Sequence, residues 1–331
     1  EMLRSLVGSE MCIRDRVLGP FVIRELKKFH ARQSEREEGP ASHKYKAGTP
    51  TMGGILILAA LVVACLIFNP WDLRKGLALF LTLGHGVIGF LDDSIKAIKH
   101  RNLGLTAKQK LAAQFVMAAI FCGILKMYLD FPTTLWIPMT SITIDLGPFY
   151  YLLVFLIIVG TSNAVNLTDG LDGLAAGSCA ITSVAYVVIA VALGYTHFAV
   201  FSAALTGACL GFLFYNQHPA KMFMGDTGSL ALGGALAAMA ILTKTELLLI
   251  LAGGLYVIEA LSVIIQVISF KTRGVRVFKM SPIHHHFELS GWSEVKVVIV
   301  FWTFSALMAV LSIFIVLASK SVSYTHLRAH E

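Results

Sequence analysis

Charged residues are scarce in this chain of 331 residues, of which Asp, Glu, Lys and Arg make up only 14%. A soluble domain carries about 25%. Hydrophobic residues account for 56% of the sequence, so a soluble globular domain is excluded. The composition predicts a single membrane domain whose outer surface lies in lipid.

Cysteines are also few, and nothing in their spacing suggests pairs. Of the five in the chain, Cys65, Cys122, Cys179 and Cys209 lie within apolar stretches. Buried free thiols explain them best, and no disulfide is expected. An internal repeat is not apparent either, which argues against a transporter built from inverted repeats.

Long hydrophobic runs dominate what is present. Nine of the predicted spans are long enough to cross about 30 Å of hydrocarbon, and we expect helices because lipid cannot satisfy an open sheet edge. The predicted spans lie near 51–68, 76–91, 111–129, 149–165, 174–193, 197–215, 228–243, 247–270 and 295–318, with a tenth, short one near 17–23. The fold class is therefore an all-α polytopic membrane protein. The loop at 130–148, which alternates around Ile142–Ile144, predicts a small hairpin.

The formal charge of +7 is distributed unevenly along the chain. Eighteen lysines and arginines fall in the loops on one side of the predicted membrane and four in the loops on the other. This asymmetry follows the positive-inside rule and places the basic loops in the cytoplasm. It accounts for the charge without a nucleic-acid partner.

Both ends of the sequence differ from the rest. Arg14, Asp15 and Arg16 stand where a first span should be apolar, and residues 321–331 are polar. We therefore predict one transmembrane domain at 17–319, and we interpret 1–16 and 321–331 as non-native extensions.

Five carboxylates follow or closely follow apolar stretches, all on the predicted cytoplasmic side. They are Asp92, Asp93, Asp169, Asp172 and Asp226. A carboxylate at a helix centre costs roughly 2.5–3.5 kcal/mol to insert, so such residues usually have a function. Several together repel one another unless a cation lies between them. The pattern predicts a metal-assisted reaction at a membrane surface.

Each acidic motif also has a structural explanation. Asp92 and Asp93 could be solvated acids at a membrane exit. In NLTDGLDG, Asp169 and Asp172 would share a face if the segment begins a helix, or one of them could cap that helix. Asp226, in MGDTGS, could likewise cap the span that follows it, whose N-terminus would suit a phosphate.

Three further segments carry weaker signals. The segment at Gly48–Gly54, GTPTMGG, could bring its backbone close to a phosphate, or it could simply lead into a helix that Thr51 caps. Phe223 could stack on a base or anchor the loop in the membrane. Three consecutive histidines in SPIHHHFE converge poorly on one metal, so contact with a phosphate or sugar, or a merely polar or pH-sensing loop, explains them better.

The order of these motifs is distinctive. The chain resembles the phospho-N-acetylmuramoyl-pentapeptide transferase family in four motifs and their order: DD after a span, NLTDGLDG, MGDTGS, and PIHHHFE followed by GWSE. This family belongs to the polyprenyl-phosphate N-acetylhexosamine-1-phosphate transferases. The resemblance extends over roughly Val17 to Ser319.

The resemblance implies ten membrane helices, both termini outside, a cytoplasmic active-site cleft and a homodimer in the bacterial inner membrane. It implies transfer of phospho-MurNAc-pentapeptide from UDP-MurNAc-pentapeptide to undecaprenyl phosphate with Mg²⁺ as cofactor. The products would be lipid I and UMP, in the first membrane step of peptidoglycan synthesis.

The resemblance also implies roles for individual residues. Asp226 matches the magnesium ligand, Asp92 a base that deprotonates the lipid phosphate, and Asp93 its essential neighbour. Lys108 matches a lysine lining the site, and Phe223 a ring that stacks on uracil. The remaining substrate-binding matches are Asn166, Asp169, Asp172, Asn216, His284, His285 and His286.

Two other functions remain open at this point. A transferase of GlcNAc-1-phosphate would keep the acids but lose PIHHHFE. An ion-coupled transporter would use the acids as cation sites near the middle of discontinuous helices.

Overall fold

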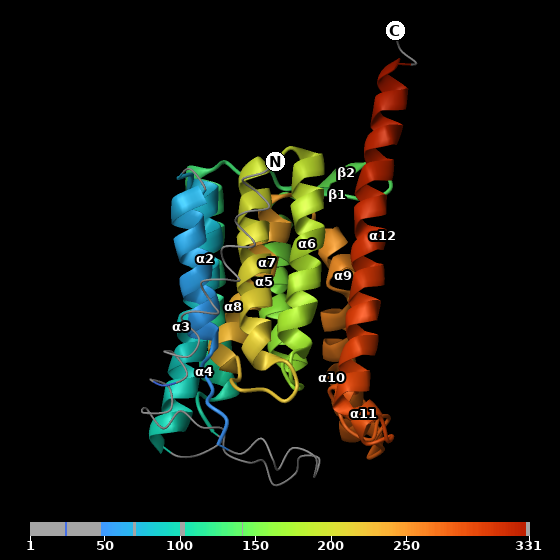
Figure 1. Ribbon diagram of the computed structural model, residues 1–331. Coiled ribbons are helices and arrows are strands. Elements are labelled where there is room, and N and C mark those ends of the chain that lie inside the picture. The colour runs from blue at the N-terminus through green and yellow to red at the C-terminus, as the bar shows by residue number, and fades with distance from the viewer. Residues whose placement is uncertain (1–23, 25–47, 69–70, 100–102, 141, 329–331) are drawn as a thin grey trace.

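The computed structural model describes residue 24 and residues 48–68, 71–99, 103–140 and 142–328. This part of the chain is almost entirely helical (Figure 1). The helices are α2 (Gly54–Phe68), α3 (Leu73–Lys99), α4 (Ala107–Tyr128), α5 (Phe149–Thr168), α6 (Leu174–Leu193), α7 (Thr196–Asn216), α8 (Gly225–Leu242), α9 (Glu246–Ala252), α10 (Gly254–Arg273), α11 (Ile283–Glu288) and α12 (Glu294–Arg328). Among the described residues, eight helices are long and apolar enough to cross a membrane, and α2 is a shorter apolar helix. The predicted all-α polytopic membrane fold is confirmed, while the short span expected near 17–23 lies outside the described residues.

One predicted span is wrong in detail. The apolar run expected as a single helix at 247–270 is divided at Gly253 into α9 and α10. The Gly253 N–H donates to the Leu249 carbonyl at 2.7 Å, and a Cβ at Gly253 would lie only 2.9 Å from that same oxygen. Two adjacent glycines therefore permit a break that the continuous hydrophobicity of the run conceals.

The predicted hairpin is confirmed. Strands β1 (Thr134–Trp136) and β2 (Thr143–Asp145) pair antiparallel at the end of the bundle opposite α11 (Figure 1). Lys244, between α8 and α9, contacts the loop that leads into β1. Its Nζ donates to the Pro132 carbonyl at 3.1 Å and forms an ion pair with Glu246 at 3.1 Å. Burial lowers the pKa of the Lys244 amine, an effect that Glu246 opposes.

Helix α8 forms the centre of the bundle. Every residue from Thr227 to Leu242 is buried, and α3, α5 and α2 pack around it. Small residues make this packing close: a Cβ at Gly54 of α2 would collide with the Gly228 backbone, and one at Gly89 of α3 with the Asp226 carbonyl. Glycine at such contacts lets helix backbones approach each other within a membrane.

Because successive long helices run in opposite directions, the C-terminal ends of some lie beside the N-terminal ends of others. The last turns of α3, α5 and α7 lie at the same end of the bundle as the first turns of α4, α6, α8 and α12, and α11 lies there too (Figure 1). All the acidic motifs are found at this end.

Candidate active site

Three carboxylates from distant parts of the sequence meet where α3 ends and α8 begins. Asp92, Asp93 and Asp226 each offer an oxygen, and these oxygens lie within 4.8 Å of one another. We call this group the carboxylate cluster. Its members differ in exposure: the side chains of Asp92 and Asp93 are 1% and 3% exposed, whereas that of Asp226 is 18% exposed. Asp226 is therefore the member of the cluster most open to a ligand.

Asp93 caps helix α8 from a neighbouring helix. Its Oδ1 accepts the Asp226 N–H at 3.2 Å, and its Oδ2 accepts the Thr227 N–H at 2.9 Å and the Thr227 hydroxyl at 2.7 Å. No side chain of α8 itself provides such a cap, so the capping role considered for Asp226 is not observed. Gly225, at φ +71°, lies against Asp93, where a Cβ would come within 2.6 Å of Oδ2. Asp93 thereby sets the position of Asp226.

Asp92 lies beneath the loop before α4. Its Oδ1 accepts the Leu105 N–H at 2.8 Å, and a Cβ at Gly104 would come within 2.6 Å of the same oxygen. Its Oδ2 lies 2.6 Å from the Lys96 ammonium. These contacts commit Asp92 to holding the loop and the lysine in place.

Two lysines offset part of the negative charge. Lys96 Nζ lies 3.1 Å from Asp226 Oδ2 and 3.7 Å from Asp93 Oδ1. Lys110 Nζ lies 2.7 Å from Asp226 Oδ2 and 3.5 Å from Asp92 Oδ1. Three carboxylates and two ammonium groups leave the cluster with excess negative charge, which favours a bound cation.

The lysine predicted for this site, Lys108, is exposed to solvent. Helix α4 is capped by Thr106, which accepts the Gln109 N–H at 3.3 Å, and so begins at Ala107. Within the described part of the chain no ion pair joins Lys108 to the cluster, whereas Lys110, two residues along the same helix, reaches it. The structure thus adds Lys96 and Lys110 to the candidate site.

Asn166 completes the surroundings of Asp226. Its amide donates to Asp226 Oδ1 at 2.9 Å and to the Ser229 hydroxyl at 2.8 Å. Asp226 is therefore surrounded by the carboxylates of the cluster, the Asn166 amide and two lysine ammonium groups. The possible ligand atoms in the cluster are carboxylate oxygens, which suit a hard divalent cation such as Mg²⁺ better than zinc, so the residues present fit the magnesium that the resemblance implies.

The segment that carries Asp169 and Asp172 does not begin a helix, so the condition for the two acids to share a helix face is not met. They lie in the turn between α5 and α6, and Gly173, rather than either acid, occupies the N-cap position of α6. Asp169 is half-buried and its N–H donates to the Asn166 carbonyl at 3.3 Å. Asp172 is buried and faces a different group of residues.

That group joins three segments of the chain. Asp172, His218 and Glu294 each offer a ligand atom within 4.8 Å of the others. His218 Nδ1 lies 3.2 Å from Asp172 Oδ2 and 3.4 Å from Glu294 Oε2, and the Asp172 N–H donates to Glu294 Oε1 at 2.7 Å. The sequence analysis did not identify His218, and it used Glu294 only as part of the GWSE motif. Asp172, His218 and Glu294 lie far apart in the sequence, so no regular spacing indicates that they meet.

Asn216 and Phe223 belong to the segment that leads into α8. Asn216 is buried; its Oδ1 accepts the Gly173 N–H at 3.1 Å and its Nδ2 donates to the Met222 carbonyl at 3.0 Å. The half-buried Phe223 donates its N–H to the Pro50 carbonyl at 2.8 Å and accepts the Gly53 N–H at 2.9 Å. GTPTMGG therefore pairs with the segment before Asp226 and supports its position.

The three histidines of α11 have three different partners. His284 is buried, with Nδ1 3.0 Å from Glu259 Oε1. His285 Nδ1 lies 2.9 Å from Glu288 Oε2, and His286 Nδ1 accepts the Lys279 N–H at 3.1 Å. Among the described residues, the groupings with metal-ligand geometry do not include these rings, whose Nδ1 atoms face three separate partners.

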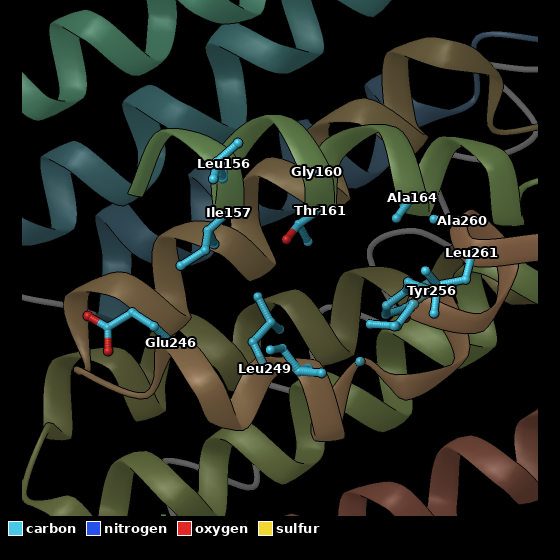
Figure 2. Close-up of a pocket in the computed structure, with 13 residues that line it drawn as sticks. Leu156, Ile157, Gly160, Thr161, Ala164, Glu246, Leu249, Tyr256, Ala260 and Leu261 are labelled. Atoms are coloured by element: carbon cyan, nitrogen blue, oxygen red, sulfur yellow. The ribbon is translucent and has the colours of Figure 1, made fainter. Parts of the chain in front are cut away.

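A separate apolar pocket of about 290 Å³ lies between α5 and the α9–α10 pair. Figure 2 shows Leu156 and Ile157 of α5 facing Leu249 across it, with Glu246 at one end and Ala164 and Ala260 at the other. Its lining is nearly all hydrocarbon, which suits an aliphatic chain and not a nucleotide.

Comparison with known proteins extends these observations. Residues 75–244 match the family model described as glycosyl transferase family 4, and residues 46–58 match phospho-N-acetylmuramoyl-pentapeptide-transferase signature 1. The chain is 57% identical to a phospho-N-acetylmuramoyl-pentapeptide-transferase of Halalkalibacterium halodurans over 90% of this chain and 93% of the relative. The enzymes of the same name from Bacillus pumilus and Bacillus subtilis are 54% and 53% identical, with the same coverage of 90% and 93%.

Proposed function

The chain belongs to the phospho-N-acetylmuramoyl-pentapeptide transferase family, and on that basis we propose that it transfers phospho-MurNAc-pentapeptide from UDP-MurNAc-pentapeptide to undecaprenyl phosphate. The products are lipid I and UMP, in peptidoglycan synthesis for the cell wall. The observation that carries the proposal is the meeting of Asp92, Asp93 and Asp226 at one end of the bundle, in a chain 57% identical to a named transferase.

The cofactor in this proposal is Mg²⁺, held by Asp226. When bound, the ion offsets charge on the donor diphosphate and polarises it for transfer. Asp226 suits this role because it is the most exposed carboxylate of the cluster. Lys96 and Lys110, which contact Asp226 at 3.1 and 2.7 Å, are placed to turn toward phosphate oxygens when the carboxylate is engaged.

Asp92 and Asp93 support this arrangement. The resemblance implies a base role for Asp92, but the acceptor is a phosphate monoester with a second pKa of about 6, so most of it has already lost that proton at neutral pH. The burial of Asp92 and its contacts with Leu105 and Lys96 support a positioning contribution instead. Asp93 holds the first turn of α8 and so orients Asp226.

The donor would bind beside the cluster. The resemblance assigns Phe223 to stacking on uracil and places Lys108 along the site, and Asn166 already contacts Asp226 at 2.9 Å. Asp169 and Asp172 in the α5–α6 turn, Asn216 beneath it, and the histidines of α11 border the same end of the bundle. In this proposal they form the nucleotide-sugar pocket.

The acceptor would arrive through the membrane. Its hydrocarbon tail suits the apolar pocket between α5 and α10, because that pocket is lined almost entirely by hydrocarbon. We further propose that the site opens to the cytoplasm, as the positive-inside rule predicts, and that the protein is a homodimer, as the resemblance implies.

A turnover assay tests the function. We expect UMP release and a labelled lipid product from UDP-MurNAc-pentapeptide and undecaprenyl phosphate, and none from UDP-GlcNAc. Preference for UDP-GlcNAc would favour the GlcNAc-1-phosphate transferase. Ion-driven uptake into sealed vesicles without UMP release would favour the transporter, although acids gathered at helix ends do not resemble its mid-span sites.

A further inference from the structure

Glu259 and His284 form a buried pair, and the proposed function assigns no role to Glu259. Glu259 lies in the second turn of α10 and His284 in the first turn of α11; both are fully buried, and Nδ1 of the histidine lies 3.0 Å from Oε1 of the glutamate. Within the described part of the chain, neither Glu259 Oε2 nor His284 Nε2 has a hydrogen-bond partner. Keeping such groups out of water is costly, so the pair must serve the fold or the site.

His284 touches the turn that carries Asp169 and Asp172. A Cβ at Gly170 would collide with Nε2 of His284, so the absence of a side chain at Gly170 lets the imidazole edge lie against the turn. Apolar contacts reinforce this position, since Leu171 of the turn belongs to the same buried cluster as Ile283 and Phe287 of α11. The contacts therefore run from Glu259 through His284 to Gly170.

The hydrogen-bond partners separate His284 from its two neighbours. His285 pairs with Glu288 within α11, and His286 accepts the nearby Lys279 N–H, so both half-buried rings are held locally. His284 is instead held by another helix. A carboxylate on Nδ1 places the ring proton there and fixes which edge of the imidazole faces Gly170.

We propose that Glu259 is a positioning residue, which acts through His284 to hold the Asp169–Gly170 turn in the form that binds the nucleotide-sugar donor. The inference rests on the proposed function. It assigns His284 to internal support and leaves His285 and His286 to contact substrate. Loss of Glu259 should then raise KM for the donor more than it lowers kcat, and should leave the KM for undecaprenyl phosphate and the magnesium requirement unchanged.

A double-mutant cycle in the full-length, detergent-purified enzyme tests whether Glu259 acts through His284. We expect E259L and H284L each to raise the donor KM by roughly tenfold or more, as loss of a hydrogen bond to a charged group predicts. The double variant should be no worse than either single variant. E259Q, which retains an acceptor for the Nδ1 proton, should recover most of the loss. S262A removes a buried hydroxyl that donates to the Glu259 backbone carbonyl at 2.7 Å but leaves the Glu259 carboxylate in place, so it is the matched control and should retain the wild-type KM.

Two further measurements guard against a trivial loss of folding. G170A approaches the contact from the turn and should raise the donor KM in the same way, because its methyl group displaces His284. Nitrogen-15 NMR of labelled histidine should show an Nδ1-protonated ring that disappears in E259L and persists in E259Q. The inference is overturned if the E259L and H284L effects add in the cycle, or if the donor KM is unchanged in an active E259L enzyme. Failure of the proposed function has a different outcome, namely absence of turnover in the wild-type protein with the histidine signal intact.

Discussion

Asp93 binds Thr227 twice, accepting the backbone N–H at 2.9 Å and the side-chain hydroxyl at 2.7 Å. The two residues are separated by 134 positions in the sequence, so this contact attaches the reactive end of α8 to α3. Because Asp226 directly precedes Thr227 and its own N–H also donates to Asp93, a change at Asp93 should displace the proposed metal ligand without altering the Asp226 side chain.

We therefore expect D93N to lower kcat by about a hundredfold, the cost of a small misplacement in an active site. Loss of a charged cap should also lower the free energy of unfolding by about 1–2 kcal/mol. UMP release and thermal unfolding in detergent measure the two effects. D145N, which alters an exposed carboxylate of the hairpin at the opposite end, should leave kcat unchanged. A D93N enzyme with wild-type kcat would contradict the positioning role.

D226N should abolish UMP release, by roughly a thousandfold or more, because the metal ion supplies several kcal/mol of stabilisation. Removing one negative charge that lies beside Lys96 and Lys110 should leave the helices intact, as size-exclusion chromatography and circular dichroism would show. Turnover close to that of the wild type would remove Asp226 from the metal site.

Chelation should have the same effect reversibly. Enzyme treated with EDTA should release no UMP, and added Mg²⁺ should restore the rate, because the oxygen-donor cluster suits a hard cation. Zinc should restore it poorly. Full activity in EDTA would mean that the lysines alone neutralise the diphosphate.

Lys108 and Lys110, both in the first turn of α4, differ in whether they reach the carboxylate cluster. K110Q should lower kcat/KM by about tenfold or more, since it removes an ion pair from a partly buried carboxylate. K108Q, at an exposed position, should have a smaller effect. K99Q, at the exposed end of α3, controls for loss of positive charge at this face. Equal losses in K110Q and K108Q would argue that Lys108 moves into the site when substrate binds.

Filling the apolar pocket tests the route of the acceptor. Gly160 lines it and has open space where a side chain would project. G160L should raise KM for undecaprenyl phosphate several-fold and leave KM for the donor unchanged, because steric overlap affects only the lipid tail. Gly123 of α4 is equally open but lies outside the pocket, so G123L provides a matched control. An unchanged acceptor KM in G160L would place the tail elsewhere.

Several features of the fold follow from the sequence for simple physical reasons. Hydrophobic runs of sufficient length must form helices in lipid, and their alternating direction places acids such as Asp92 and Asp226 at the same end. The hairpin near Ile144 followed from alternation and flanking prolines. These predictions depend only on local composition and on the two-sidedness of a membrane.

Other features depend on packing that the sequence pattern does not encode. The break at Gly253 lies in an uninterrupted apolar run, and hydrophobicity cannot distinguish one helix from two. The choice of Lys110 over Lys108 depends on where α4 starts and therefore which way each residue faces. The burial of His284, unlike that of its two neighbours, depends on the approach of Glu259 and Gly170 from other segments.

The glycine contacts around α8 have one more consequence. Because Gly54 and Gly89 let the backbones of α2 and α3 touch the first turn of α8, a side chain at either position would have to push two helices apart. The spacing of the central helices, and with it the position of Asp226, therefore depends on two residues that carry no side chain.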